Sequence, residues 1–326
     1  LLSKQNGHSS VAHQHYQAER LKALANYYLG NSEEAVTQLN RAIEGLRELI
    51  NQSNALDSQR VRYDLAQSLS DLGLISISSG RLVDAQRAYR EALEIHQSNR
   101  TDQAALALAR NNMGYLYHQI GNYKEAWREY QLANQTARAT ARHRVMISVA
   151  NGMGAILHDL EEFTEAERYY KQAIQIGFDN ELENVLSTSF MGLADIERQR
   201  GNFNLASDHL REAAGRRNQQ LNERLYHLLR GRNFLDMGQT QMALDEFDIV
   251  LERVAEHTRA APEGCLASFF RAVALDRSGN AEDATEGMRV TLKMLADLGY
   301  SNFFVSAARK SLDFAKAQQQ VLNSPQ

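Results

Sequence analysis

Histidines and paired carboxylates are the first residues of this chain to consider for chemistry, because both groups bind metals and transfer protons. His13 and His15 stand close together, but no carboxylate follows at the spacing of a metal site, so we interpret them as disordered or solvated side chains. Glu33-Glu34 and Glu161-Glu162 stand at expected helix starts, where carboxylates stabilise the positive end of the helix dipole. We therefore predict no catalytic residues, no metal site and no cofactor.

Composition excludes several other classes of function. The 326 residues carry a net charge of −4, so the chain lacks the basic footprint of a nucleic-acid-binding protein. It has no phosphate-binding glycine loop, no H-E-x-x-H or C-x-x-C motif, and no apolar run near the roughly 18 residues of a membrane span. The single cysteine, Cys265, has apolar neighbours, which favours a buried structural thiol over a reactive one and fits a reducing compartment. We expect a cytoplasmic protein that is not an enzyme and has no nucleic-acid or membrane partner.

The elements that would position any functional residue are set by a repeat. A short turn followed by an alanine occurs seven times, and successive alanines are 50, 41, 40, 40, 37 and 41 residues apart. The seven alanines are Ala35, Ala85, Ala126, Ala166, Ala206, Ala243 and Ala284. A nearly fixed period of this size is typical of a solenoid, in which stacked units bury a shared core. With only two prolines in the chain, we predict an all-α structure.

The third repeat shows how each unit is built. Gly121 predicts the positive φ that ends one helix, and Ala126, Tyr130 and Ala133 form one apolar stripe on the next. Gly114 lies seven residues before the turn glycine, where a large side chain would push the two helices apart. We call this position the close-approach residue of the repeat. The other six repeats place Ala23, Gly73, Gly154, Ala194, Gly231 and Ala272 there.

These small and aromatic residues at these offsets resemble the tetratricopeptide repeat. The resemblance implies a right-handed superhelical solenoid of about seven antiparallel helix pairs plus a C-terminal capping helix. The period near 40 exceeds the usual 34, as in repeats of bacterial regulators, kinesin light chains and Pins-type scaffolds. We expect one array with repeats near residues 11–50, 58–97, 101–138, 142–178, 181–217, 220–257 and 262–299, and a cap at 301–320.

The resemblance also indicates where a ligand would bind. In family members that hold extended peptides, the first helix of each pair lines a concave groove. The lining positions lie three and two before the close-approach residue and one and five after it. Applied to this chain, with directly adjacent polar residues, this pattern selects Ser70, Asn111, Asn112, Tyr115, Gln119, Asn151, His158, Asp195, Arg198, Gln199 and Arg232. The same positions also include Asp71, Ala155, Asp159 and Asp236.

The expected groove is rich in amides at its centre. Each amide presents a donor and an acceptor, which suits a peptide backbone of any sequence. A structural alternative carries equal weight: Asn111 or Asn112 would bond to the neighbouring repeat and fix its stagger, and Tyr115 would be packed. Nearer the C-terminus the lining turns apolar, and we expect half of its side chains in the core and half in an open patch. These side chains are Leu228, Leu229, Phe269, Phe270 and Val273.

One family ligand is disfavoured. Tetratricopeptide arrays that clamp the carboxylates of chaperone tails carry Asn directly after the close-approach glycine. Here that position holds Leu74 after Gly73 and Tyr115 after Gly114. We therefore do not expect a chaperone tail as the ligand.

Two functions remain open. The stretch 292–305 resembles the end of sensor domains in MalT-like and antibiotic-regulatory bacterial activators, and the chain starts without Met. We therefore predict a peptide- or protein-binding module that is the sensor region of a larger bacterial transcriptional regulator. A small-molecule inducer is a further option, as is a homodimer through an end repeat. The alternative function is a stand-alone scaffold that assembles a protein complex.

Overall fold

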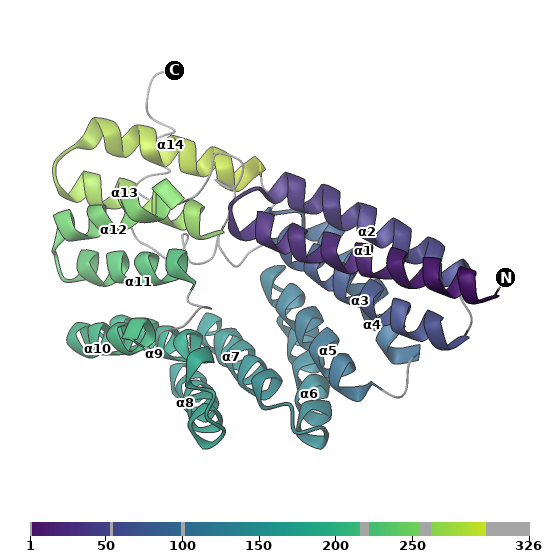
Figure 1. Cartoon of the computed structure of the whole chain (residues 1–326). Helices are drawn as coiled ribbons and strands as arrows, with labels where there is room; N and C mark the ends of the chain where they lie inside the picture. The colour runs from purple at the N-terminus through teal and green to yellow at the C-terminus, as the bar shows by residue number, and fades with distance from the viewer. Residues whose placement is uncertain (1, 53–54, 99–101, 216–221, 254–261, 298–326) are drawn as a thin grey trace.

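The computed structural model describes residues 2–52, 55–98, 102–215, 222–253 and 262–297, and within these ranges it contains helices and no strands. Fourteen α-helices follow one another along a curved path (Figure 1). They are α1 (Leu2–Tyr28), α2 (Ser32–Gln52), α3 (Ala55–Ser78), α4 (Leu82–Ser98), α5 (Gln103–Gln119), α6 (Tyr123–Ala139), α7 (His143–Asp159), α8 (Phe163–Asp179), α9 (Ser187–Gln199), α10 (Phe203–Gly215), α11 (Glu223–Asp236), α12 (Thr240–Arg253), α13 (Pro262–Arg277) and α14 (Ala281–Asp297), with a short 3-10 helix, η1 (Glu183–Val185), before α9. The predicted all-α solenoid is confirmed.

The turn inside each helix pair has one construction. At the end of α5, the Gly121 N–H donates to the His118 carbonyl and the Asn122 N–H to the Tyr117 carbonyl, which is the pairing of a Schellman motif. Gly121 has a φ of 75°, as the sequence indicates. The Asn122 side chain then accepts from the backbone of α6 and caps its start. The turn therefore ends one helix and begins the next within two residues.

The fourth turn keeps the same hydrogen-bond pattern although it has no glycine. Glu161 occupies the glycine position with a φ of 64°, and its N–H donates to the His158 carbonyl as in the other turns. Glu162 follows at the N-cap of α8. The acidic pair is therefore part of the turn as well as being close to the helix dipole.

Helices pack through an aromatic side chain held between two glycines. A Cβ atom at Gly114 would lie 2.7 Å from Cδ1 of Tyr130, and one at Gly152, in the following pair, would lie 2.3 Å from its Cζ. Both distances are shorter than any normal contact, so only glycine allows Tyr130 to fill the space between α5, α6 and α7. Tyr130, Ala126 and Ala133 are buried, as the apolar stripe predicts.

The three helices at the start of the chain, α1 to α3, are longer than the helices from α5 to α8. The helices α1, α2 and α3 have 27, 21 and 24 residues, whereas α5 to α8 have 17 each. The extra turns explain why the first two alanines of the repeat are 50 residues apart. Each expected repeat contains one helix pair, and the division into seven repeats remains our proposal. The expected cap at 301–320 lies outside the described residues.

The array curves back toward its own start (Figure 1). Leu82, the first residue of α4, packs against a buried cluster formed mainly by α11, α12 and α13, and this cluster includes Phe247 and Phe269. The concave side is therefore bounded by helices from both ends of the described chain. Such closure depends on the angle between successive pairs, which no local pattern in the sequence specifies.

Candidate functional site

The concave side encloses one large cavity. Its volume is about 1580 Å³, and its wall is formed chiefly by the first helices of the pairs, from α3 to α13. All eleven residues that the sequence analysis selects are among those lining it. The structure therefore brings the candidate residues to one surface. Whether they bind a ligand remains a proposal.

The wall formed by α3 and α5 is mainly polar and uncharged, and we call it the amide wall (Ser70, Asn111, Asn112 and Tyr115). Tyr115 is 37% exposed, so it is not a packed core residue. Asn111 is only 7% exposed, and its Oδ1 atom has no hydrogen-bond partner among the described residues. The Ser70 hydroxyl donates to the Ala66 carbonyl of its own helix. A bond between pairs therefore explains neither the Asn111 oxygen nor the Ser70 hydroxyl.

Asn151 makes the kind of bond to the neighbouring repeat that the sequence left open for Asn111 or Asn112. The Ser189 hydroxyl of α9 donates to Asn151 Oδ1 at 2.7 Å, and both residues are buried. This bond joins α7 to the next pair. Asn111 stands at the equivalent place on α5, where the corresponding residue of the next pair is Val149 and offers no hydroxyl. An asparagine at this place therefore fixes the position of one helix pair on the next in the case of Asn151, whereas the Oδ1 atom of Asn111 has no such partner among the described residues.

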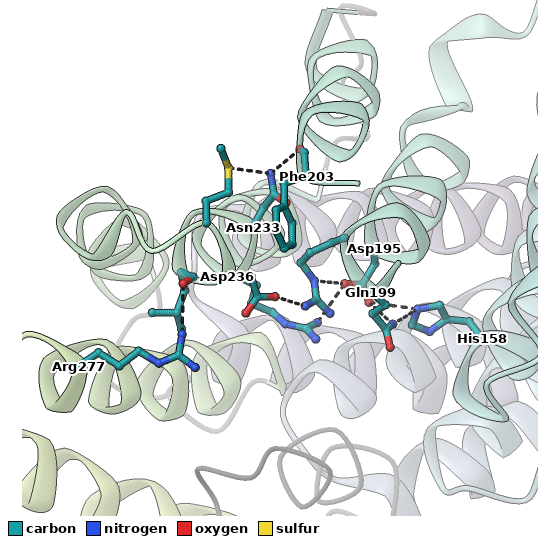
Figure 2. Close-up of polar contacts among 11 residues, drawn as sticks. His158, Asp195, Gln199, Phe203, Asn233, Asp236 and Arg277 are labelled. Carbon is teal, nitrogen blue, oxygen red and sulfur yellow. Dashed lines mark hydrogen bonds and ion pairs between the residues drawn. The ribbon is translucent and has the colours of Figure 1, made fainter. Parts of the chain in front are cut away.

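Farther along the groove the lining is charged, and we call it the ion cluster (His158, Asp159, Asp195, Arg198, Arg232 and Asp236). Figure 2 shows its members His158, Asp195 and Asp236. Asp195 lies at its centre. Its carboxylate lies 2.8 Å from Arg198 Nε, 3.2 Å from His158 Nε2 and 3.4 Å from Arg232 Nη1. Arg198 also bonds to Asp236 on α11, so the cluster joins three successive first helices.

The cluster is part of a regular ladder. Four places after its close-approach residue, each of the helices α5, α7, α9 and α11 bonds to a residue one period farther along the chain. His118 Nε2 lies 2.8 Å from Asp159 Oδ2, and Gln199 Nε2 lies 2.7 Å from His158 Nε2. The next two rungs are Arg198 with Asp236, and the Leu235 carbonyl, which accepts from Arg277 Nη1 at 3.2 Å. These bonds fix the rotation of one pair on the next.

Burial and charge together set the protonation states in the cluster. Burial disfavours the charged form of His158, but hydrogen bonds to Asp159 and Asp195 outweigh this effect and raise its pKa to about 9. For Asp195, burial is outweighed by Arg198, Arg232 and His158, which hold its pKa well below the usual range. His158 is therefore a cation and Asp195 an anion at neutral pH. Since both nitrogens of an imidazolium donate, the Gln199 amide next to His158 Nε2 presents its oxygen to the ring.

Two expectations are corrected. Leu228, Leu229, Phe269, Phe270 and Val273 are all less than 10% exposed, so they are core residues rather than half core and half open patch, although all except Phe269 reach the cavity wall. His13 is not a solvated side chain, because its Nε2 lies 2.5 Å from Asp64 Oδ2, on α3. Helix pairing brings that carboxylate from 51 residues away, which local spacing cannot show. No group of three His, Cys, Asp or Glu side chains within the described ranges is placed to hold a metal.

Sequence reasoning also missed part of the lining. His118 was not selected, although His158 and Arg198 occupy the same place in later repeats. Arg144, Arg224 and Arg277 also line the cavity. A search for polar partners at one period plus one residue would have found His118, because the rungs join residues 41, 41, 38 and 42 positions apart.

Solved structures with the same architecture support the fold. A Rap protein complexed with competence and sporulation factor has a TM-score of 0.67 and 14% identity, over 87% of this chain and 75% of that chain. Aspartyl phosphate phosphatase F from Bacillus subtilis has a TM-score of 0.65 and 12% identity, over 96% of this chain and 75% of that chain. The apo form of RapI has a TM-score of 0.61 and 13% identity, over 86% of this chain and 97% of that chain. At this identity the likeness concerns the fold alone.

Sequence comparison identifies the repeat. No curated protein gave a significant match. No helix in the described part of the chain is long and apolar enough to cross a membrane. The expected likeness to MalT-like activators stays a prediction. Residues 64–139 and 145–219 match the family model of the tetratricopeptide repeat. With the turns and the glycine–aromatic packing described above, these matches show that residues 64–139 and 145–219 carry tetratricopeptide-type helical repeats.

Proposed function

We propose that this protein is a non-catalytic module that binds a peptide, or a peptide segment of a partner protein, in its concave cavity. The observation that carries the proposal is the cavity itself, whose volume of about 1580 Å³ exceeds the roughly 300–1000 Å³ of typical small-molecule sites. A small-molecule inducer fits such a space less well than a peptide. A Rap protein with the same architecture has been solved complexed with competence and sporulation factor, which supports a ligand-binding role for the cavity.

The amide wall supports a peptide as the ligand. Asn111 Oδ1 is a buried acceptor without a partner among the described residues, and an unpaired buried acceptor costs free energy until it is satisfied. Asn112 and the exposed Tyr115 add further polar groups on the same helix. Peptide N–H and C=O groups are complementary to such side chains. The amide wall would therefore read the backbone of the ligand.

The ion cluster gives no support to an enzymatic role. Asp195 is held as an anion by three cations, so it is no proton donor at neutral pH. The Asp159 and Asp236 carboxylates bond to His118 and Arg198 of neighbouring pairs. The cluster thus has the arrangement of a structural ion network.

The cellular context follows from the sequence rather than from the cavity. We propose that the module is the sensor region of a larger bacterial transcriptional regulator that acts in signal transduction in the cytoplasm, because the stretch 292–305 resembles such sensors. A stand-alone scaffold is the alternative. The full reading frame separates them: an encoded nucleotide-binding domain upstream supports the sensor, and an open reading frame starting just before Leu1 excludes it.

Affinity selection with a pool of short mixed-sequence peptides tests the binding. We expect the protein to retain a subset of the pool, and the double variant Asn111→Ala/Asn112→Ala to bind that subset about tenfold more weakly, the factor expected for one or two lost hydrogen bonds. Mass spectrometry of the retained peptides provides the measurement.

A matched control removes two amides from another surface. Gln131 and Gln135 are exposed on α6, and their double alanine variant should bind like the unchanged protein. Equal weakening by both double variants would show that the amide wall is not the site. Retention of no peptide by the unchanged protein would reject peptide binding.

A further inference from the structure

The cavity wall formed by α9, α11 and α13 carries a surplus of positive charge. Four arginines and three carboxylates of these helices line it. On α3 and α5, by contrast, Asp71 is the one carboxylate in the lining, and it pairs with Arg20 outside the cavity. Opposite ends of the groove therefore offer a ligand different chemistry.

Arg232 is the arginine of the ion cluster whose hydrogen bonds are least satisfied. Its Nη1 lies 3.4 Å from Asp195 Oδ1, beyond the roughly 2.7–3.2 Å of a well-formed N–H···O bond. Its Nε has no hydrogen-bond partner among the described residues. Arg198, by comparison, lies 2.8 Å from the same carboxylate and also bonds to Asp236.

The guanidinium of Arg232 lies over an aromatic ring. Its carbon atom is 4.9 Å from the centroid of the Phe270 ring, which is a cation–π contact. A guanidinium also carries N–H donors in a planar fork, and these donors bind a carboxylate in a bidentate way. Burial and the nearby Arg198 lower the pKa of Arg232 to about 10, so its charge is incompletely balanced.

We propose that Arg232 is an anion subsite of the peptide cavity and receives a carboxylate of the ligand, with Arg198 beside it. The ligand class is a short peptide that ends in a free α-carboxylate. This assignment rests on the proposed peptide-binding function. Charge complementarity carries it, because a carboxylate supplies the acceptor oxygens that Asp195, shared among three cations, cannot supply to Arg232.

Two peptide pools that differ in one group test the assignment. One pool has free α-carboxylates and the other is the same mixture with C-terminal amides. We expect the protein to bind its best peptides about tenfold more tightly in the free-carboxylate form. Arg232→Gln should remove this preference while leaving the affinity for the amidated peptides unchanged.

A second variant separates ligand binding from folding. Asp236→Asn removes a carboxylate that competes for Arg198, so we expect it to increase the preference for free carboxylates, opposite to Arg232→Gln. Weakened binding of both pools by both variants would mean that the cluster only supports the fold, and would overturn the subsite. Arg168→Gln is the control, because Arg168 is exposed and pairs with Glu165 on the surface of α8.

Failure of the subsite can be told apart from failure of peptide binding. Equal retention of both pools by the unchanged protein would overturn the carboxylate subsite and leave the proposed function standing. Retention of neither pool would overturn both. A preference for free carboxylates that survives in Arg232→Gln would place the anion elsewhere and would also overturn the assignment.

Discussion

The two walls of the groove use polar side chains in opposite ways. In the ion cluster, side chains from successive helices bond to one another, as His118 does with Asp159 and Arg198 with Asp236. In the amide wall, Asn111 keeps an unpaired acceptor and Ser70 bonds within its own helix. The ion cluster mainly holds the superhelix in shape, and within it only Arg232 and Arg198 are also proposed to meet a ligand, whereas the amide wall is left for the ligand. Lining a groove is therefore not sufficient to identify a binding residue.

The largest expected effect lies at the centre of the ion cluster. Asp195→Ala leaves His158, Arg198 and Arg232 without their shared carboxylate, and an uncompensated buried charge costs about 3–5 kcal/mol of the free energy of unfolding. Urea unfolding followed by circular dichroism measures the loss. Asp208→Ala is the control, because Asp208 is exposed in a surface pair and its removal should change little.

A small loss in Asp195→Ala would contradict the structural role of the cluster. Repeat arrays can unfold in more than one step, so both variants are to be compared over the whole transition and not at its midpoint alone. A loss confined to the part of the transition that reports on the C-terminal half would still agree with the cluster joining α7, α9 and α11.

The next effect concerns pH. The pKa of His158 is raised to about 9, above the 6.5 of an ordinary histidine, so protonation stabilises the fold. This contribution is complete below pH 6.5 and is lost as the pH rises through 9. We expect the free energy of unfolding to fall by about 2 kcal/mol between pH 7 and 10 on this account.

Nuclear magnetic resonance of the imidazole ring tests the cause directly. The titration midpoint of His158 should lie near 9, with His158→Gln identifying its signal. Asp195→Asn should move the midpoint toward the ordinary value, since it removes one of the two carboxylates that raise it. A midpoint near 6.5 in the unchanged protein would show that the carboxylates do not hold the imidazolium.

Much of the fold follows from the sequence because it depends on local rules. Gly121 ends a helix, Gly114 permits close approach, and Tyr130 fills the resulting space, and all three requirements recur with the repeat. The groove surface follows too, since the position of a side chain on the first helix decides which way it faces. All eleven selected residues therefore line the cavity, although His118, Arg144, Arg224 and Arg277 were missed.

The partnerships inside the groove were not predictable in the same way. Whether Asn151 bonds depends on a hydroxyl at Ser189, in another repeat, and on the angle between pairs that brings them to 2.7 Å. The contact of His13 with Asp64 and that of Leu82 with the C-terminal cluster need the same long-range geometry. Residue type and position in the repeat cannot tell a ligand-binding amide from one that fixes the stagger.

The smallest effect is therefore the sharpest test of the comparison. Asn111 and Asn151 stand at the same place in successive repeats, three residues before the close-approach glycine. Asn151→Ala leaves the buried Ser189 hydroxyl without its acceptor and should lower the free energy of unfolding by about 1–2 kcal/mol. Asn111→Ala removes an unpaired acceptor, so we expect a change within about 0.5 kcal/mol. Equal losses in the two variants, measured by the same urea unfolding, would show that Asn111 also joins its helix to the next pair, and the two walls would then differ in charge but not in role.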